Sequence, residues 1–447
     1  MTVESQLPDA GPERGVHGAS ARDDATSSSG ARQPVEGVAP HRRRNALLLA
    51  GGLVLHGGMI QLAVALGTVT IVAVTGMEAV LGLGPAVYLV SGALAVAPAG
   101  RLSDSLGRIT VVRGGYLLGV AGPVLTAAGC ATGVAPLAFG GLALCGAAHA
   151  IVLLSRTAAA EMFRPERRAR ALSVVLFGVV FGAIWGPLVF GPMFAGKHIT
   201  TADLVEPWLV AGLFPLAGFV VTLFVRMPPE ERTREARTAR VAAAREASLA
   251  ALIGRRGILR AMVAAGGSYL VMAGVMNLSG FVAVGHGHQH GAVFTIISIH
   301  IVGMYGLVLV VGELVERLGR RAAMAGGLLT MAVSNLSLVW LDSVAGMSIS
   351  MFGLGLGWCF AYVAGSTELV DLAGPVERGR LVGATDLSAS LGAAVFAIGG
   401  GVLYSWTDSP APLALGATAL ALLGALFVAS SSGRDALRAS EPAVETP

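Results

Sequence analysis

Charged residues are scarce in this sequence. Asp, Glu, Lys and Arg make up only 13% of its 447 residues, whereas soluble domains carry about 25%. Cysteine is scarcer still, and the three cysteines (Cys130, Cys145 and Cys359) each lie inside an apolar run. This placement excludes a disulfide framework and a Cys-x-x-Cys metal site. HExxH, GxSxG and phosphate-loop patterns are also missing, and His56 and His149 each stand alone in an apolar run. We therefore do not expect an enzyme.

Long apolar runs dominate the chain instead. Hydrophobic residues make up 54% of it, and the mean hydropathy is +0.72. A helix needs about 20 apolar residues to cross a bilayer core, and twelve runs approach or exceed that length. The predicted fold class is therefore an all-α membrane protein with twelve transmembrane helices. The predicted spans are Ala46–Val74, Ala79–Ala99, Ile109–Ala131, Val134–Ala160, Ala171–Phe194, Leu204–Val225, Ile258–Val284, Ala292–Val311, Ala322–Leu341, Val344–Leu369, Leu381–Tyr404 and Ala411–Ala429.

Basic residues gather in the even-numbered connections between these spans. They are Arg101, Arg108 and Arg113 in or beside the second connection, Arg164, Arg167, Arg168 and Arg170 in the fourth, the arginines from Arg232 to Arg256 in the sixth, Arg317, Arg320 and Arg321 in the eighth, and Arg378 and Arg380 in the tenth. The odd-numbered connections carry mainly acidic residues, with Lys197 as their one strong base. By the positive-inside rule, both termini face the cytoplasm of a bacterial-type inner membrane. The net charge of +4 does not indicate nucleic-acid binding, because the basic residues do not cluster on a soluble face.

Composition divides the chain into five predicted parts. Residues 1–44 form a disordered cytoplasmic tail, because they are polar and contain no apolar run. Residues 45–226 and 258–429 each form a six-helix bundle. Residues 227–257 form a cytoplasmic linker whose Ala- and Arg-rich helix would lie on the inner leaflet, and residues 430–447 form a second tail. We expect a monomer whose partners are the lipid bilayer and a small transported solute or metal ion.

The predicted seventh and eighth spans form a hairpin that carries soft metal ligands. Met272 and Met276 lie four residues apart on the first helix, and His300 and Met304 lie four apart on the second. Residues at this spacing share one face of a helix. Thioether and imidazole groups suit Cu(I), so the hairpin allows two stacked levels of copper ligands. A methionine in a membrane helix more often fills a packing gap, whereas a histidine in mid-span is a functional candidate.

The turn of this hairpin contains three more imidazoles. His286, His288 and His290 alternate with Gly and Gln in a short polar segment that the charge pattern places outside the membrane. These histidines could collect Cu(I) at the outer mouth, or the turn could be an ordinary solvated loop. No permanently bound cofactor is expected, and Cu(I) would be the cargo.

Two connections of the first half recur in the second half. Gly100–Arg108 matches Gly312–Arg320, and Glu161, Pro165, Arg168 and Arg170 match Asp371, Pro375, Arg378 and Arg380. Two helical halves repeated in parallel are typical of transporters that work by a rocking motion. The candidate gating residues of the first match are Asp104, Gly107, Arg108, Glu316, Arg317, Gly319 and Arg320.

These residues resemble the major facilitator superfamily, over the chain from Arg42 to about Ala429. The family pattern in this loop is Gly-x-x-x-Asp-(Arg/Lys)-x-Gly-(Arg/Lys)-(Arg/Lys). The second copy fits with Glu316 in place of Asp, whereas the first has Ser105 and Ile109 where bases are usual. The resemblance implies alternating access around a cavity lined by the first, fourth, seventh and tenth helices. Met272 and Met276 lie on the seventh.

A narrower resemblance concerns the copper-importing branch of the family (CcoA-like transporters). Its signature is similar to Met272-x-x-x-Met276 followed by His300-x-x-x-Met304. The resemblance implies that both pairs take part in copper uptake. Related members of that branch are associated with riboflavin instead, so the resemblance leaves the cargo open.

The alternative function is transport of a small organic solute, either uptake of a riboflavin-like vitamin or proton-coupled efflux of drugs or metabolites. Trp185, Trp358 and Tyr362 could line a larger pocket, and Asp386, mid-span in the eleventh helix, could carry a proton. Arg156 is the one arginine deep in a predicted span, and it is either a pathway or gating residue or the partner of Glu161. A receptor or scaffold without transport is disfavoured, because it would not need the repeated gate loop.

Overall fold

The computed structural model describes residues 40–161, 179–194, 199–225, 248–374 and 377–439, and these form helices and turns with no β-strand among them. The first half, up to residue 225, contains α1 (Pro40–Thr75), α2 (Leu83–Leu106), α3 (Arg108–Thr132), α4 (Ala135–Val152), α5 (Leu154–Glu161), α7 (Gly191–Met193) and α8 (Val205–Leu223). The second half contains α10 (Leu249–Ile253), α11 (Ile258–Met262), α12 (Ser268–Gly285), α13 (His290–Ile301), α14 (Val308–Leu318), α15 (Arg320–Ser337), α16 (Val344–Leu372), α17 (Arg378–Thr407) and α18 (Ala411–Ala439). Among the described residues, three π-helical turns interrupt or end longer helices: η2 (Gly186–Phe190), η4 (Val263–Gly267) and η5 (Val302–Gly306).

Most of these helices can cross a membrane. Within the described ranges, nine are long and apolar enough, and the bent pair His290–Gly306 with Val308–Leu318 would make a tenth span. Of the predicted span Ala171–Phe194, only residues 179–194 are described, as a shorter apolar helix. The predicted span Ala322–Leu341 is α15, which packs against α16 and α18 but falls short of the same test of length and hydropathy. The predicted all-α membrane class is confirmed.

The eighth predicted span differs from expectation. The sequence predicts one unbroken helix over Ala292–Val311, and this was wrong, because the chain bends by 50° between Gly306 and Val308. The π turn η5 precedes the bend, and Leu307 leaves the helical conformation with φ −104° and ψ 5°. A π turn closes its hydrogen bonds over five residues instead of four. The side chains that follow it therefore point in a different direction around the helix axis than they would in a regular α-helix.

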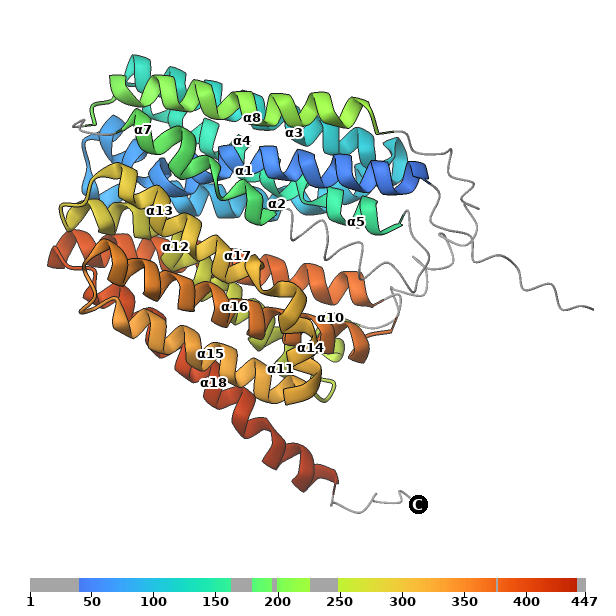
Figure 1. Cartoon of the computed structure of the whole chain (residues 1–447). Coiled ribbons are helices and arrows are strands. Elements are labelled where there is room, and N and C mark those ends of the chain that lie inside the picture. Colours follow the sequence, from blue (N-terminus) through green and yellow to red (C-terminus); the bar gives the residue numbers. More distant parts are fainter. Residues whose placement is uncertain (1–39, 162–178, 195–198, 226–247, 375–376, 440–447) are drawn as a thin grey trace, which may run out of the picture. The chain divides into compact units, whose positions relative to one another are not determined.

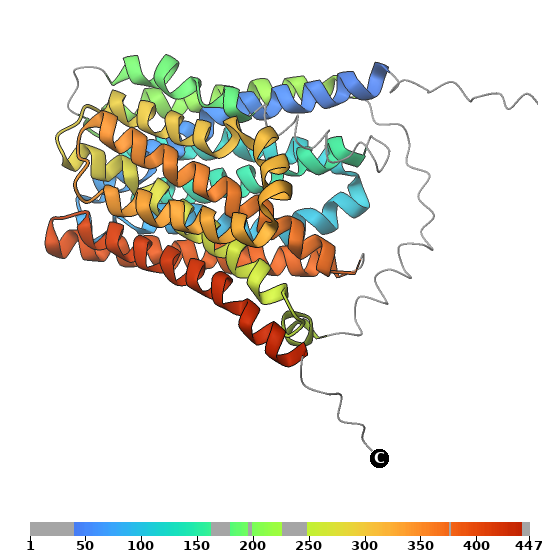
Figure 2. The ribbon, with the colours of Figure 1, turned by 60° about the horizontal axis from the view of Figure 1, so that its bottom comes forward.

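The two halves lie side by side in Figure 1, the first coloured blue to light green and the second yellow to red, and in Figure 2 helices of the second half lie in front of part of the first. They are joined by packing of α1 on α12, of α2 on α17 and of α13 on η2 and α7. Glycines make the close approaches possible: a Cβ at Gly280 would lie 2.2 Å from the carbonyl oxygen of Ala65, and one at Gly82 would lie 2.2 Å from that of Ala397. Thr68 Oγ1 also donates to the carbonyl of Asn277 at 3.1 Å. These contacts lie near the end of the bundle that holds the α12–α13 turn, which we call the turn end.

The opposite end, here called the basic end, is held by ion pairs. Arg320, at the start of α15, pairs with Asp371, near the end of α16, at 2.5 Å. Arg260 of α11 pairs with Glu368 of α16, and Arg255 pairs with Glu377 at 2.6 Å. The Arg255 guanidinium holds the pKa of the Glu377 carboxyl below its usual value, chiefly through this hydrogen bond. The end of α16 therefore meets α11 and α15, and Glu377, at the start of α17, meets the segment that follows α10.

The repeated gate loop has the same backbone conformation in both halves. Gly107 has φ 86° and ψ 146°, and Gly319 has φ 82° and ψ 138°, a region that residues with a Cβ rarely adopt. Each glycine ends one helix and starts the next without a connecting loop. Among the acids, Glu316 is exposed, and the side chain of Asp104 lies outside the described residues.

The basic members of the gate loop have separate partners. Arg317 pairs with Glu313 within α14, whereas Arg320 reaches α16. Arg320 thus links the first repeated motif to the second, since Asp371 is the acid of that second motif. The gating role of these residues stays a prediction.

Candidate functional site

Arg156 lies where the two halves face each other. It follows the turn at Leu153 that separates α4 from α5, and it is half-buried. Its guanidinium lies close to the hydroxyl of Tyr362 on α16, and it is close enough to Asp386 on α17 for their charges to interact. The structure therefore brings together the two residues that the sequence singles out as pathway candidates, one from each half.

Aromatic rings extend this site into the second half. Trp358 and Tyr362 lie four residues apart on α16, so they share one face, and their ring centroids are 4.8 Å apart with planes at 20°. Tyr305 of η5 meets Trp358 edge-on, with centroids 5.6 Å apart. Tyr269 of α12 lies close to Ser390 of α17 and within electrostatic range of Asp386. We call Arg156, Asp386, Tyr269, Tyr305, Trp358 and Tyr362 the interface cluster.

The interface cluster offers several kinds of contact to a ligand. Arg156 and Asp386 supply opposite charges, the tyrosines supply hydroxyl groups, and the stacked rings supply flat apolar surface. The indole Nε1 of Trp358 is buried and has no hydrogen-bond partner, although buried Trp N–H groups usually find one. Trp185 is not part of this site, because its Nε1 donates to the carbonyl of Val54 and its ring packs on Phe214 within the first half.

A second polar site, inside the first half, is one that the sequence did not predict. His56 of α1 and His149 of α4 lie with ring centroids 5.8 Å apart and planes at 7°. His56 is fully buried, and both of its ring nitrogens and Nδ1 of His149 have no hydrogen-bond partner. The sequence shows each histidine only as an isolated imidazole in a span. We call the two the histidine pair.

The predicted copper ligands lie mainly in the interior of the second half. His300 is fully buried, and its Nδ1 lies 2.7 Å from the carbonyl oxygen of Met351 on α16. Met304 also faces α16, because a Cβ at Gly355 would lie 3.1 Å from its Cγ. The π turn η5 contains Met304 but not His300, so the four-residue spacing does not put them on one regular helical face.

The two methionines of the seventh span differ in burial, whereas His300 and Met304 are both buried. Met272 is 2% exposed, whereas Met276 is half-buried. Met276 lies one turn before Gly280, which packs on α1 of the first half. In the part of the chain that the structure describes, no group of three or more His, Cys, Asp or Glu side chains is arranged to hold a metal ion. The ligand role of Met272, Met276, His300 and Met304 stays a prediction.

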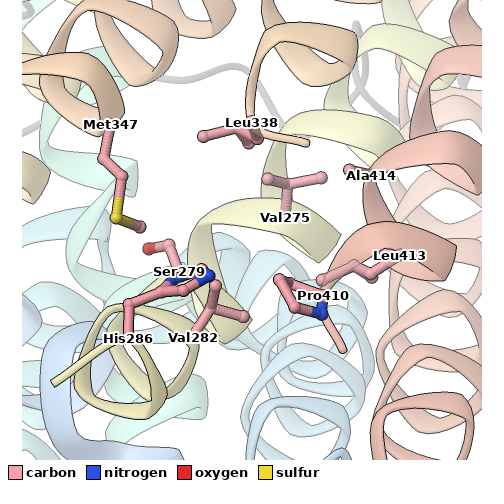
Figure 3. A pocket seen from close by; sticks show the side chains of 9 residues that line it. All are labelled: Val275, Ser279, Val282, His286, Leu338, Met347, Pro410, Leu413 and Ala414. Atoms are coloured by element: carbon pink, nitrogen blue, oxygen red, sulfur yellow. The ribbon is translucent and has the colours of Figure 1, made fainter. Parts of the chain in front are cut away.

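The three histidines of the turn point to different places. Nε2 of His288 lies 2.5 Å from the carbonyl oxygen of Asp342, and the ring of His290 lies 6.2 Å from that of Phe194. His286 lines a largely apolar pocket at the turn end of the second half, together with Ser279 and Met347 (Figure 3). The structure thus gives the three imidazoles separate surroundings, and their joint capture of a metal ion is still only predicted.

Comparison with known proteins decides the family. The family model described as Major Facilitator Superfamily matches residues 47–308 and 261–445. This chain belongs to the Major Facilitator Superfamily. It is accordingly a multi-pass membrane transporter, and its interface cluster lies between the two halves of a superfamily fold.

Two relatives within the superfamily are described differently, one only as an MFS-type transporter and the other as a riboflavin transporter. The MFS-type transporter YdeG of Bacillus subtilis is 28% identical over 367 residues, which cover 80% of this chain and 85% of YdeG. The riboflavin transporter RfnT of Brucella anthropi is 26% identical over 352 residues, covering 77% of this chain and 85% of RfnT. Both alignments span most of each protein, so they relate whole transporters.

Solved structures show the same fold. A D-xylose–proton symporter superposes with a TM-score of 0.70 at 16% identity, covering 87% of this chain and 97% of the symporter. A peptide transporter of the POT type superposes with a TM-score of 0.64 at 16% identity, covering 87% of this chain and 94% of the transporter. At this identity the likeness concerns the fold and does not extend to the cargo.

Proposed function

We propose that this superfamily transporter carries a small organic solute with a planar, polar ring system, and that the interface cluster binds it. The observation that carries the proposal is the stack of Trp358 on Tyr362, whose hydroxyl meets Arg156 from the other half. A flat solute could lie against the stacked rings while its polar edge is held by Arg156 and Asp386. Stacking of this kind contributes about 0.5–1.5 kcal/mol beyond the burial of apolar area.

The position of the site supports alternating access. A solute that touches both Arg156 and Tyr362 contacts both halves, so its binding energy depends on how the halves are placed relative to each other. A ligand shifts a conformational equilibrium only through such a difference in affinity between states. The close contacts at the turn end, among them Gly280 on Ala65, would have to open to admit the solute from that side.

Riboflavin is the first probe to use. A relative covering 77% of this chain is described as a riboflavin transporter, and the isoalloxazine ring of riboflavin is planar with polar edges. Uptake of a riboflavin-like vitamin is therefore our leading proposal, ahead of proton-coupled efflux of drugs or metabolites.

Copper uptake is the competing proposal. It rests on the resemblance of the Met272, Met276, His300 and Met304 signature to the copper-importing branch. The placement of His300 is compatible with copper uptake, because Nδ1 of His300 bonds to the Met351 carbonyl while its buried Nε2 has no hydrogen-bond partner, an arrangement usual for metal-binding imidazoles. The two proposals require different residues, so one set of variants separates them.

The test uses purified protein in liposomes loaded with unlabelled riboflavin. We expect saturable counterflow of labelled riboflavin, its loss in Arg156→Gln, and its retention in Trp406→Ala, since Trp406 is 79% exposed at the end of α17. A parallel assay measures accumulation of Cu(I). If riboflavin and other ring-bearing solutes give no counterflow above empty liposomes, and Cu(I) accumulates in a manner that His300→Ala abolishes, the organic-solute proposal is wrong.

A further inference from the structure

The backbone carbonyl of Ala183 joins the two halves on the turn-end side of the molecule. It accepts hydrogen bonds from Gln61 Nε2 at 2.8 Å and from Ser298 Oγ at 2.6 Å, and Gln61 Nε2 also donates to Ser298 Oγ at 3.0 Å. Gln61 and Ala183 belong to the first half, whereas Ser298 lies on α13 of the second. We infer that these three groups form a latch that holds the turn end closed, and we call it the carbonyl latch. The inference goes beyond the proposed function, because it concerns a conformational step and does not depend on the solute.

Pro187 explains why this carbonyl is available. In a regular α-helix the carbonyl of Ala183 would accept the backbone N–H of the residue four positions later. That residue is Pro187, which has no backbone N–H. Buried carbonyls rarely stay unpaired, so side chains from α1 and α13 take the place of the missing donor. A proline in the first half thus creates an acceptor that the second half satisfies.

The hydroxyl of Ser298 has one acceptor in each half. Its Oγ lies 2.6 Å from the carbonyl oxygen of Ala183 and 2.7 Å from that of Phe294, one turn earlier on its own helix. A hydroxyl carries one proton, so it donates to one of these oxygens at a time. When the halves separate, the Phe294 carbonyl remains as its acceptor. Opening therefore leaves no unsatisfied hydroxyl on α13, and the contact can be made and broken without that penalty.

Aromatic rings keep water away from the latch. Phe294 stacks on both Phe190 and Phe194 of the first half, with ring centroids 5.7 Å and 6.0 Å apart, and all three rings are buried. Gly186 permits this close approach, since a Cβ there would lie 3.1 Å from Gln61 Cδ and 3.2 Å from Phe294 Cβ. Hydrogen bonds are stronger in such low-dielectric surroundings. The latch therefore contributes most while the halves are packed together.

The test measures the distance between spin labels at Thr75→Cys and Val284→Cys, at the ends of α1 and α12, in liposomes with no solute added. Ser298→Ala removes both hydrogen bonds that cross between the halves. It should raise the ratio of open to closed distances about fivefold, the effect expected from losing about one net hydrogen bond. The matched control is Ser279→Ala, because Ser279 Oγ donates to the carbonyl of Met276 within α12. It should leave the ratio unchanged.

Pro187→Ala tests the origin of the latch. It restores a backbone N–H that can bond to the Ala183 carbonyl. The ratio of open to closed distances should therefore rise, and Ser298→Ala should add little in this background. The matched control is Pro215→Ala, since Pro215 lies within α8 and packs on Gly119 of α3, both in the first half. It should leave the ratio unchanged.

Two results would overturn the inference: a ratio in Ser298→Ala equal to that in Ser279→Ala, or a ratio in Pro187→Ala equal to that in Pro215→Ala. Each comparison stands by itself, so the inference stays testable if one variant does not fold. Failure of riboflavin counterflow would count against the proposed function but would leave these distances unchanged, so the two failures can be told apart.

Discussion

The ring of Trp358 stacks on that of Tyr362 at 4.8 Å, and the Tyr362 hydroxyl lies close to the guanidinium of Arg156 from the other half of the chain. The stack is fixed locally by the four-residue spacing on α16. The contact with Arg156 is fixed only by the approach of the two halves. A solute bound here would therefore sense whether the halves are together or apart, which is the requirement for coupling binding to transport.

The first prediction concerns Trp358→Ala. Removing the indole should raise the KM for riboflavin about tenfold, the effect of losing about 1.4 kcal/mol of binding free energy. Trp358→Phe, which keeps a flat ring, should recover most of the affinity. Initial rates of uptake against riboflavin concentration measure the change, with Trp406→Ala as the exposed-tryptophan control. An unchanged KM in Trp358→Ala would remove Trp358 from the binding site.

The second prediction concerns closure at the turn end. Gly280→Ala places a Cβ 2.2 Å from the Ala65 carbonyl oxygen, so α12 and α1 must separate. Overpacking of this kind costs about 1–3 kcal/mol, which should shift the protein toward a state that is more open at this end. Spin labels at Thr75→Cys and Val284→Cys should report a longer distance. In Gly267→Ala no atom lies within 4 Å of the new Cβ, and the distance there should not change. Equal distance distributions in both variants would refute the closure.

The third prediction concerns pH and the Arg255–Glu377 pair. The pKa of Glu377 is lowered from its usual value of 4.5. The pair therefore stabilises the packing of α10, which precedes Arg255, fully above pH 4.5. The stabilisation is lost as the pH falls through the lowered value. A spin label at Ala250→Cys on α10 should therefore become mobile below pH 4.5, and in Glu377→Gln it should be mobile at neutral pH as well. A label that stays immobile in Glu377→Gln would show that the pair does not hold α10.

The fourth prediction compares two ion pairs of different burial. In the Arg260–Glu368 pair the side chains are 19% and 10% exposed, so Glu368→Gln leaves a charge in a poorly hydrated place. We expect a loss of about 2–3 kcal/mol in the free energy of unfolding. In the Arg317–Glu313 pair the side chains are 73% and 65% exposed, and Glu313→Gln should cost less than about 0.5 kcal/mol. Thermal unfolding in detergent measures both, and equal losses would contradict this ranking.

Local sequence patterns were enough to predict the class of the protein and the position of most helices. Low charge and long apolar runs are local properties, and a bilayer permits few ways to satisfy the backbone of such runs other than helices. The repeated loop was also readable, because Gly107 and Gly319 occupy a conformation that strongly favours glycine. The same local reasoning failed at the eighth span, where a π turn and a bend follow His300.

Which side chains meet depends on how the helices pack against one another. His56 and His149 belong to different helices, and Arg156 and Asp386 belong to different halves, so no periodicity within one segment could pair them. Trp358 and Tyr362 were predicted only as possible pocket residues, although their four-residue spacing puts them on one face of α16, where they stack. The same spacing was used to pair His300 with Met304, where the helix is not regular. Spacing describes the faces of a single helix, whereas a site between helices depends on how those faces are turned toward one another by packing.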